Sequence, residues 1–190
     1  MNEVLESLRA GECVLLATDT VYGLAAMPST LGYKRIFELK RRDAQQVLPW
    51  LVGSVGDLDR YGDDVPVYAR KLAQAFWPGG LTLVVRASKG ARVLGSVADD
   101  GTVALRMPDE PFALRLLGEL DAPLACTSAN LHGLPAPQHL ADVDPSMREL
   151  ASDKAIPSSC KGGTASTIVD CTQPAAPCIS DEAIEACLNS

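Results

Sequence analysis

Cations gathered at the end of one helical segment are the first residues in this sequence that could do chemistry. Lys34, Arg35, Lys40, Arg41 and Arg42 place five of the seventeen basic residues within nine positions, although the formal net charge is −7. Residues two apart on a continuing helix point in different directions, so Lys40 and Arg42 converge only if the helix ends between them. An ammonium beside a planar guanidinium would then suit a polyphosphate. The alternative is that these cations only favour the negative end of the helix dipole and are solvated.

Three further segments place hydroxyl, amide or glycine residues beside predicted strands. Ser128 and Asn130 lie two apart just beyond the apolar run 123–126, at a place where ligands of α/β proteins commonly bind. The glycine-rich stretch 161–170 could hold an anion with its backbone N–H groups. A polar break interrupts the apolar pattern within 18–25. Each of these segments could instead be an ordinary turn.

The sequence lacks the residues that several catalytic mechanisms require. His132 and His139 are its two histidines, which argues against a histidine relay and against a multi-histidine metal site. Neither a Walker A pattern, a dinucleotide-binding glycine motif, a nucleophile elbow nor a zinc-protease helix is present. We therefore expect a site that aligns reactive substrates and stabilises charge, with no metal held by protein side chains.

Composition predicts a globular domain of ordinary character. The 190 residues are 47% hydrophobic and 22% charged, which is enough to build one core. The acidic balance and an aromatic content of 5% argue against a protein that coats nucleic acid. With no targeting segment and no long apolar run, we expect a cytoplasmic protein without a membrane span. Reduced thiols are expected at all six cysteines, namely Cys13, Cys126, Cys160, Cys171, Cys178 and Cys187. The alternative is a disulfide or redox role among the last four of them.

Apolar periodicity predicts helices and strands that alternate along the chain. Helices are expected at 3–10, 29–42, 66–76, 110–120, 139–152 (in two pieces broken at Pro145) and 181–188. Strands are expected at 13–18, 47–52, 81–87, 103–107, 123–128 and 167–171. This interleaving predicts an α/β domain, with some α+β character, built on a mixed sheet.

Six segments, taken in order, resemble the YrdC-like family. They are ATDTVYGLA at 17–25, IFELKRR at 36–42, WPGGLTLVV at 77–85, VALRMP at 103–108, TSANLHG at 127–133 and GGTASTIVD at 162–170. The resemblance implies one YrdC-like domain over residues 1–190, with a twisted mixed sheet, flanking helices and a basic central cleft. It also implies a nucleotidyltransferase that forms threonylcarbamoyl-AMP and pyrophosphate from L-threonine, bicarbonate or CO2, and ATP with Mg2+. A separate transferase would then pass the threonylcarbamoyl group to tRNA.

The family motifs Lys-x-Arg and Ser-x-Asn carry the implied ATP site. They fall on Lys40, Arg42, Ser128 and Asn130, which would bind ATP and its leaving pyrophosphate and carry the catalysis. The resemblance adds Thr102 as a further ATP contact. A Lys40→Ala variant is expected to lose most activity while its melting temperature stays nearly unchanged.

The implied threonine site uses a different set of residues. Arg106 would clamp the carboxylate of threonine, and Thr18 would line the same pocket. Without the resemblance, the favoured interpretation of Arg106 is an arginine that extends from a strand end to solvent. The threonine contacts implied by the family are Thr20, Tyr22, Arg106 and Ser166.

The chain departs from the family pattern beside the cation pair. Asp43 stands where proline usually follows Lys-x-Arg, and a later proline is displaced to Pro49. A carboxylate there could weaken ATP binding or re-aim Arg42. The alternative function is therefore a diverged paralogue that binds RNA weakly, or binds nucleotide, without adenylation. A third alternative is a scaffold whose acidic C-terminal stretch binds a partner, although exposed acidic helices are usually just solvated.

Overall fold

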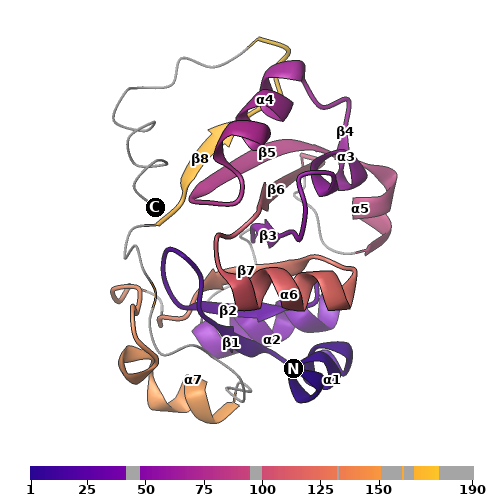
Figure 1. Ribbon diagram of the computed structural model, residues 1–190. Helices are drawn as coiled ribbons and strands as arrows, with labels where there is room; N and C mark the ends of the chain where they lie inside the picture. The colour runs from indigo at the N-terminus through magenta and orange to yellow at the C-terminus, as the bar shows by residue number, and fades with distance from the viewer. Residues whose placement is uncertain (42–47, 95–99, 132, 151–159, 161–164, 176–190) are drawn as a thin grey trace.

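The computed structural model describes residues 1–41, 48–94, 100–131, 133–150, 160 and 165–175. Within these residues, eight strands form one sheet in the order β1-β2-β7-β3-β6-β5-β4, with β8 beside β5 (Figure 1). The strands are β1 (Val14–Leu16), β2 (Gly23–Ala26), β3 (Trp50–Leu51), β4 (Gly62–Asp63), β5 (Leu81–Ala87), β6 (Thr102–Arg106), β7 (Leu124–Ser128) and β8 (Thr167–Asp170). Because β3 pairs with β6 in parallel while β7 pairs with β3 antiparallel, the predicted mixed sheet is confirmed.

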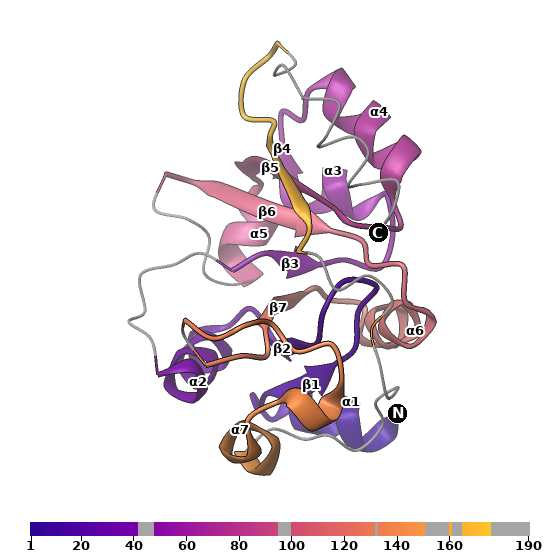
Figure 2. The same cartoon turned by 90° about the vertical axis from the view of Figure 1, so that its left-hand side faces the viewer.

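Helices cover both faces of this sheet. Figure 2 shows α2 and α6 on opposite sides of β2 and β7. The helices are α1 (Asn2–Arg9), α2 (Thr30–Lys40), α3 (Asp57–Tyr61), α4 (Val67–Phe76), α5 (Lys89–Leu94), α6 (Pro111–Leu120) and α7 (Pro145–Leu150), with a 3-10 turn η1 (Leu140–Asp142). In the described part of the chain, none of them is both long and apolar enough to cross a membrane.

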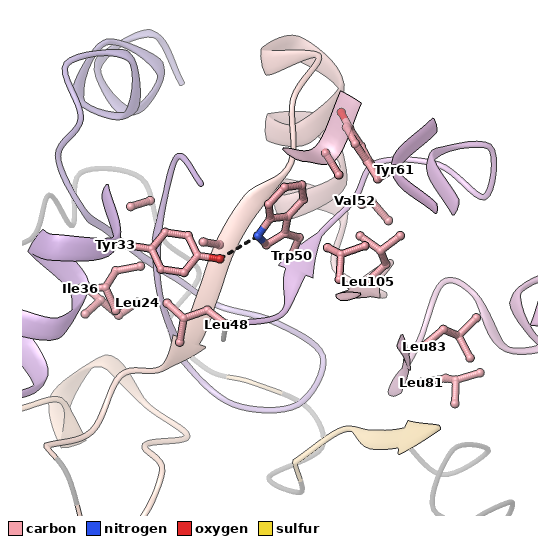
Figure 3. Packing of buried hydrophobic residues seen from close by; sticks show 14 of the residues in the cluster. Leu24, Tyr33, Ile36, Leu48, Trp50, Val52, Tyr61, Leu81, Leu83 and Leu105 are labelled. Atoms are coloured by element: carbon pink, nitrogen blue, oxygen red, sulfur yellow. Dashed lines mark hydrogen bonds between the residues drawn. The ribbon is translucent and has the colours of Figure 1, made fainter. Parts of the chain in front are cut away.

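Two buried clusters, one on each face, hold the helices against the strands. Successive side chains of a strand point to opposite faces, so Trp50 joins the cluster of Tyr33 and Ile36 from α2. The next residue, Leu51, joins the cluster that contains Leu116 from α6. The indole N–H of Trp50 donates to the Tyr33 hydroxyl over 2.9 Å (Figure 3). Each fully buried aliphatic side chain contributes about 1.5–3 kcal/mol, which fixes α2 firmly on its face.

Helix α2 ends where the cation pair requires it to end. The Ser29 hydroxyl caps its beginning by accepting from the Gly32 N–H over 3.1 Å. Lys40 is its last residue, and Arg41 adopts a left-handed conformation with φ of 52°. The helix therefore stops between Lys40 and Arg42, as convergence of their side chains demands, while Arg42 itself lies outside the described residues together with Asp43.

Most expected elements are confirmed, and the differences have local causes. The strand expected at 47–52 is reduced to the two residues of β3, directly after Pro49, because proline cannot donate to a sheet. β2 was not predicted as a strand, since Gly-Leu-Ala-Ala is buried on both faces and gives no alternation. Pro145 begins α7 and separates it from η1. The helix expected at 181–188 lies outside the described residues.

The cysteines of the described chain are free thiols. They are Cys13, Cys126, Cys160 and Cys171. Burial raises the pKa of the Cys13 thiol to about 12, so this group stays protonated and unreactive at neutral pH. Cys178 and Cys187 lie outside the described residues.

Gly23 allows β2 to approach β7 closely. A Cβ atom placed there would lie 2.5 Å from the Cys126 Sγ and 3.5 Å from the Leu16 carbonyl oxygen. We expect Gly23→Ala to lower the free energy of unfolding by about 1–3 kcal/mol through overpacking, measured by urea denaturation. In a Cys126→Ala background the same substitution should be milder by about 1 kcal/mol, because the clashing sulfur is gone. Strictly additive effects of the two substitutions would contradict this explanation.

Candidate active site

The turn between β1 and β2 supplies the buried partners of Arg106, the last residue of β6. The Arg106 Nη2 donates to the Asp19 carboxylate over 2.6 Å, and its Nη1 donates to the Thr20 hydroxyl over 2.8 Å. Its Nε donates to the Gly79 carbonyl over 3.1 Å. Arg106 is 6% exposed and Asp19 is 1% exposed. The interpretation of Arg106 as an arginine that extends to solvent is therefore wrong, because it forms a buried ion pair.

The hydroxyl groups of Thr20 and Thr18 extend the hydrogen-bond network of Arg106, and each of them donates away from Arg106. The Thr18 hydroxyl donates to the Val21 carbonyl over 2.8 Å, and it lies 2.9 Å from the Thr20 hydroxyl. A hydroxyl has a single proton, so Thr20 must donate to Thr18 while it accepts from Arg106. Thr20 consequently faces any further group as an acceptor only.

A glycine turn before β5 connects Arg106 to the start of β8. The Gly79 carbonyl accepts from Arg106, and the Gly79 N–H donates to the Met107 carbonyl over 2.8 Å. The adjacent Gly80 carbonyl accepts from the Thr167 N–H over 2.9 Å. A Cβ atom on Gly79 would lie 2.8 Å from the Phe76 carbonyl oxygen, so this close approach requires glycine. One turn thus positions both the guanidinium and the segment that carries Ser166.

A second cluster gathers around the ammonium group of Lys40. Its Nζ donates to the backbone oxygens of Ser128 and Asn130, the latter over 2.9 Å, and to the Asn130 Oδ1 over 3.2 Å. The Ser128 hydroxyl also donates to the Asn130 Oδ1, and the Asn130 amide donates to the Leu134 carbonyl. Lys40 is 3% exposed. The loop after β7 is therefore held to the end of α2 by one buried cation.

Charges from both clusters act on Cys126 of β7. Burial raises the pKa of the Cys126 thiol to about 12, against the opposing effect of the Arg106 and Lys40 charges, so both cations act on the same thiol. Tyr22 adds a backbone connection, because its N–H donates to the Pro137 carbonyl and its carbonyl accepts from the Ala129 N–H. The Arg106 cluster and the Lys40 cluster are therefore neighbours at β7.

The chain is similar to known proteins along most of its length. A family model named Sua5_yciO_yrdC and described as "Telomere recombination" matches residues 6–181. The chain belongs to the Sua5/YciO/YrdC family. Threonylcarbamoyl-AMP synthase of Bacillus subtilis is 39% identical over 142 residues, which are 72% of this chain and 41% of that protein. The synthase of Pyrococcus abyssi is 37% identical over 171 residues, which are 87% of this chain and 49% of that protein.

A solved Sua5 structure confirms the YrdC-like fold. The crystal structure of P. abyssi Sua5 complexed with L-threonine superposes with a TM-score of 0.78 at 35% identity, covering 87% of this chain and 49% of that one. The chain therefore spans about half the length of these Sua5 relatives.

The structure of this Sua5/YciO/YrdC chain brings together most of the residues singled out from its sequence. Those in the two clusters and their immediate surroundings are Thr18, Thr20, Tyr22, Lys40, Arg106, Ser128, Asn130 and Ser166. Thr102 is elsewhere, at the start of β6, where its N–H and hydroxyl both donate to the Asp100 Oδ1. The ring of Tyr22 is fully buried, and burial raises the pKa of its hydroxyl to about 12.

Sequence reasoning missed three residues of the site. Asp19 lies inside the quoted polar break without an assigned role, and Gly79 lies inside the quoted segment 77–85 without one. Thr82 is fully buried and shares a 2.9 Å hydrogen bond with the Ser166 hydroxyl. The available signal is a lone hydroxyl within the apolar run 81–85, because a buried polar group needs a partner.

Thr82 is expected to hold Ser166 in place for substrate binding. In Thr82→Val the side chain keeps its shape and loses the hydroxyl, so we expect the KM for threonine to rise about three- to tenfold. Steady-state pyrophosphate release measures it, and an unchanged KM would show that Ser166 needs no such support. Thr102→Val is the comparison variant. It should leave the KM for ATP within about twofold of the unmodified protein's value. A larger rise would show that Thr102 contacts ATP.

Proposed function

We propose that this chain is a threonylcarbamoyl-AMP synthase that joins L-threonine, bicarbonate or CO2, and ATP into threonylcarbamoyl-AMP and pyrophosphate. The carrying observation is the pair of adjacent clusters, one centred on the buried Arg106 and one on the buried Lys40. Relatives named threonylcarbamoyl-AMP synthase at 37–39% identity and a Sua5 relative that holds L-threonine support it. A separate transferase acting on tRNA would consume the product in the cytoplasm.

In this proposal the Arg106 cluster binds threonine. A guanidinium has five N–H groups, and three of those on Arg106 have protein acceptors among the described residues. The other two would bind the threonine carboxylate, which suits the planar fork of arginine. Ser166 and Thr20 would contact the remainder of the substrate, and the buried Tyr22 would form the wall behind them.

The Lys40 cluster would bind ATP. Ser128 and Asn130 lie next to the ammonium group, and Arg42 follows two residues after Lys40. A pocket of about 560 Å3 adjoins Asn130 and is bordered by Leu131 and Leu134, a volume typical of small-molecule sites. This pocket would hold the nucleoside part of ATP. Mg2+ would arrive with ATP as part of the substrate, bound to phosphate oxygens.

The reaction needs alignment and charge neutralisation from the protein. The ammonium group of threonine first loses a proton to solvent, and the neutral amine adds to CO2 with release of a second proton. The resulting carbamate oxygen attacks the α-phosphorus while the bond to pyrophosphate breaks. No protein nucleophile takes part in either step. The two clusters therefore have two tasks, to hold the three reactants in line and to neutralise the phosphate charge. Neither task requires a histidine.

The direct test is pyrophosphate release from ATP and Mg2+ with bicarbonate and each amino acid in turn. We expect release that depends on both threonine and bicarbonate. Binding of ATP and threonine without such release would overturn the proposal. Steeply salt-dependent RNA binding in that case would favour the alternative of a diverged RNA-binding paralogue.

A further inference from the structure

The carboxylate of Asp19 has one oxygen in use and one without a partner. Its Oδ1 accepts from Arg106, whereas its Oδ2 is buried and has no hydrogen bond within the described part of the chain. An unpaired buried acceptor is unfavourable, and a buried ionised one more so. Native structures pair nearly all such groups, so an exception calls for an explanation such as a missing ligand group.

Donors and acceptors left over in this cluster are complementary to an α-amino acid. Arg106 offers two N–H groups, which suit a carboxylate. Asp19 offers its Oδ2, and Thr20, whose proton is committed to Thr18, offers a lone pair. These two acceptors suit an ammonium group, which has three donors and no acceptor.

Charge points to the same ligand. Arg106 and Asp19 together carry no net charge and are buried. A ligand with only a carboxylate would approach Arg106 against the repulsion of Asp19, which is little screened in a buried site. A zwitterion brings its own cation to Asp19, so both ends of the ion pair gain a partner.

We propose that the Asp19–Arg106 pair is a receptor for the zwitterionic form of the amino acid, in which Asp19 Oδ2 accepts from the α-ammonium and Arg106 donates to the α-carboxylate. Asp19 is then the residue that selects for an α-amino group. The inference rests on the proposed function and assigns the recognition within its threonine site. Because Oδ2 is buried, the side chains that cover it must move to admit the ligand.

The first test compares two ligands on the unmodified protein by titration calorimetry, without ATP. L-threonine and (R)-3-hydroxybutanoate share the carboxylate and the hydroxyl, but the second lacks the ammonium group. We expect threonine to bind about ten- to a hundredfold more tightly, the range for a charged hydrogen bond. Equal affinities would overturn the inference.

The second test repeats the comparison in Asp19→Asn, which keeps the shape and the Oδ1 acceptor. The preference for threonine over (R)-3-hydroxybutanoate should fall at least about tenfold. The matched control is Asp59→Asn, which makes the same change in the exposed pair of Asp59 with Arg70 and should leave the preference unaltered. An unaltered preference in a folded Asp19→Asn variant would overturn the inference.

The outcomes separate this inference from the function on which it rests. Should the unmodified protein fail to bind threonine at all, the proposed function fails first. Should it bind threonine and release pyrophosphate while Asp19→Asn keeps its preference, only the recognition by Asp19 is wrong. If Asp19→Asn does not fold, the two-ligand comparison on the unmodified protein decides the matter alone.

Discussion

Replacing Lys40 with methionine is expected to remove at least about 99% of pyrophosphate release and to lower the free energy of unfolding by about 3 kcal/mol. The ammonium group binds three oxygens of Ser128 and Asn130 from a position 3% exposed. Without it, those oxygens lose their common donor, and the loop after β7 loses its connection to α2. Steady-state release of pyrophosphate and urea denaturation measure the two effects.

This expectation corrects the one drawn from sequence, in which Lys40→Ala leaves the melting temperature nearly unchanged. A lysine that only contacts ATP would be exposed and dispensable for folding, whereas this one is buried and bonded. Lys34→Met is the matched control on the same helix, because Lys34 is 70% exposed and pairs only with Glu38 among the described residues. Should Lys40→Met be as stable as Lys34→Met, the loop would not depend on this ammonium group.

Arg106→Lys is expected to raise the KM for threonine at least about a hundredfold while the KM for ATP changes little. Lysine keeps the charge beside Asp19, but all three of its N–H donors are on one nitrogen. It therefore cannot replace the three nitrogens of Arg106 that reach Asp19, Thr20 and Gly79, and it has no further N–H groups for a carboxylate. Loss of several charge-assisted hydrogen bonds supports an effect of this size. Separate substrate titrations of pyrophosphate release measure both KM values.

The matched control for Arg106→Lys is Arg86→Lys on β5, whose side chain is exposed. It should leave both KM values within about twofold. A variant Arg106→Lys in which the two KM values rise together would place Arg106 in a general structural role. A rise in the KM for ATP alone would show that the proposal assigns the two clusters to the wrong substrates.

Much of the fold follows from local signals in the sequence. α2 was predicted from apolar spacing and a serine cap, and its end at Lys40 follows from the requirement that two cations converge. β5 was predicted at its observed bounds, because an apolar run between glycines and polar residues has few other conformations. β2 was missed because four small, fully buried residues carry no periodicity. An alternation of apolar and polar residues arises where one face of a strand meets the core and the other meets solvent. Both faces of β2 are buried, so its residues do not alternate.

The site was less accessible to sequence reasoning because its contacts are long-range. The partner of Arg106 is 87 positions away at Asp19, so the spacing of residues along the chain cannot predict this ion pair. The same holds for Thr82 and Ser166, which are 84 positions apart. Only the resemblance to a family pointed to Arg106. The ATP contact that the resemblance implies for Thr102 stays a prediction, because Thr102 begins β6 and Arg106 ends it.

These separations also bear on the order in which the protein folds. The long-range side-chain bonds of both clusters join positions 84 to 90 residues apart. Closing such long loops is entropically unfavourable until the strands between them have paired. Neither the N-terminal nor the C-terminal half can therefore form a complete cluster by itself. Any ligand of these clusters should recognise the completed fold alone, and its binding would stabilise the native state without assisting earlier folding intermediates.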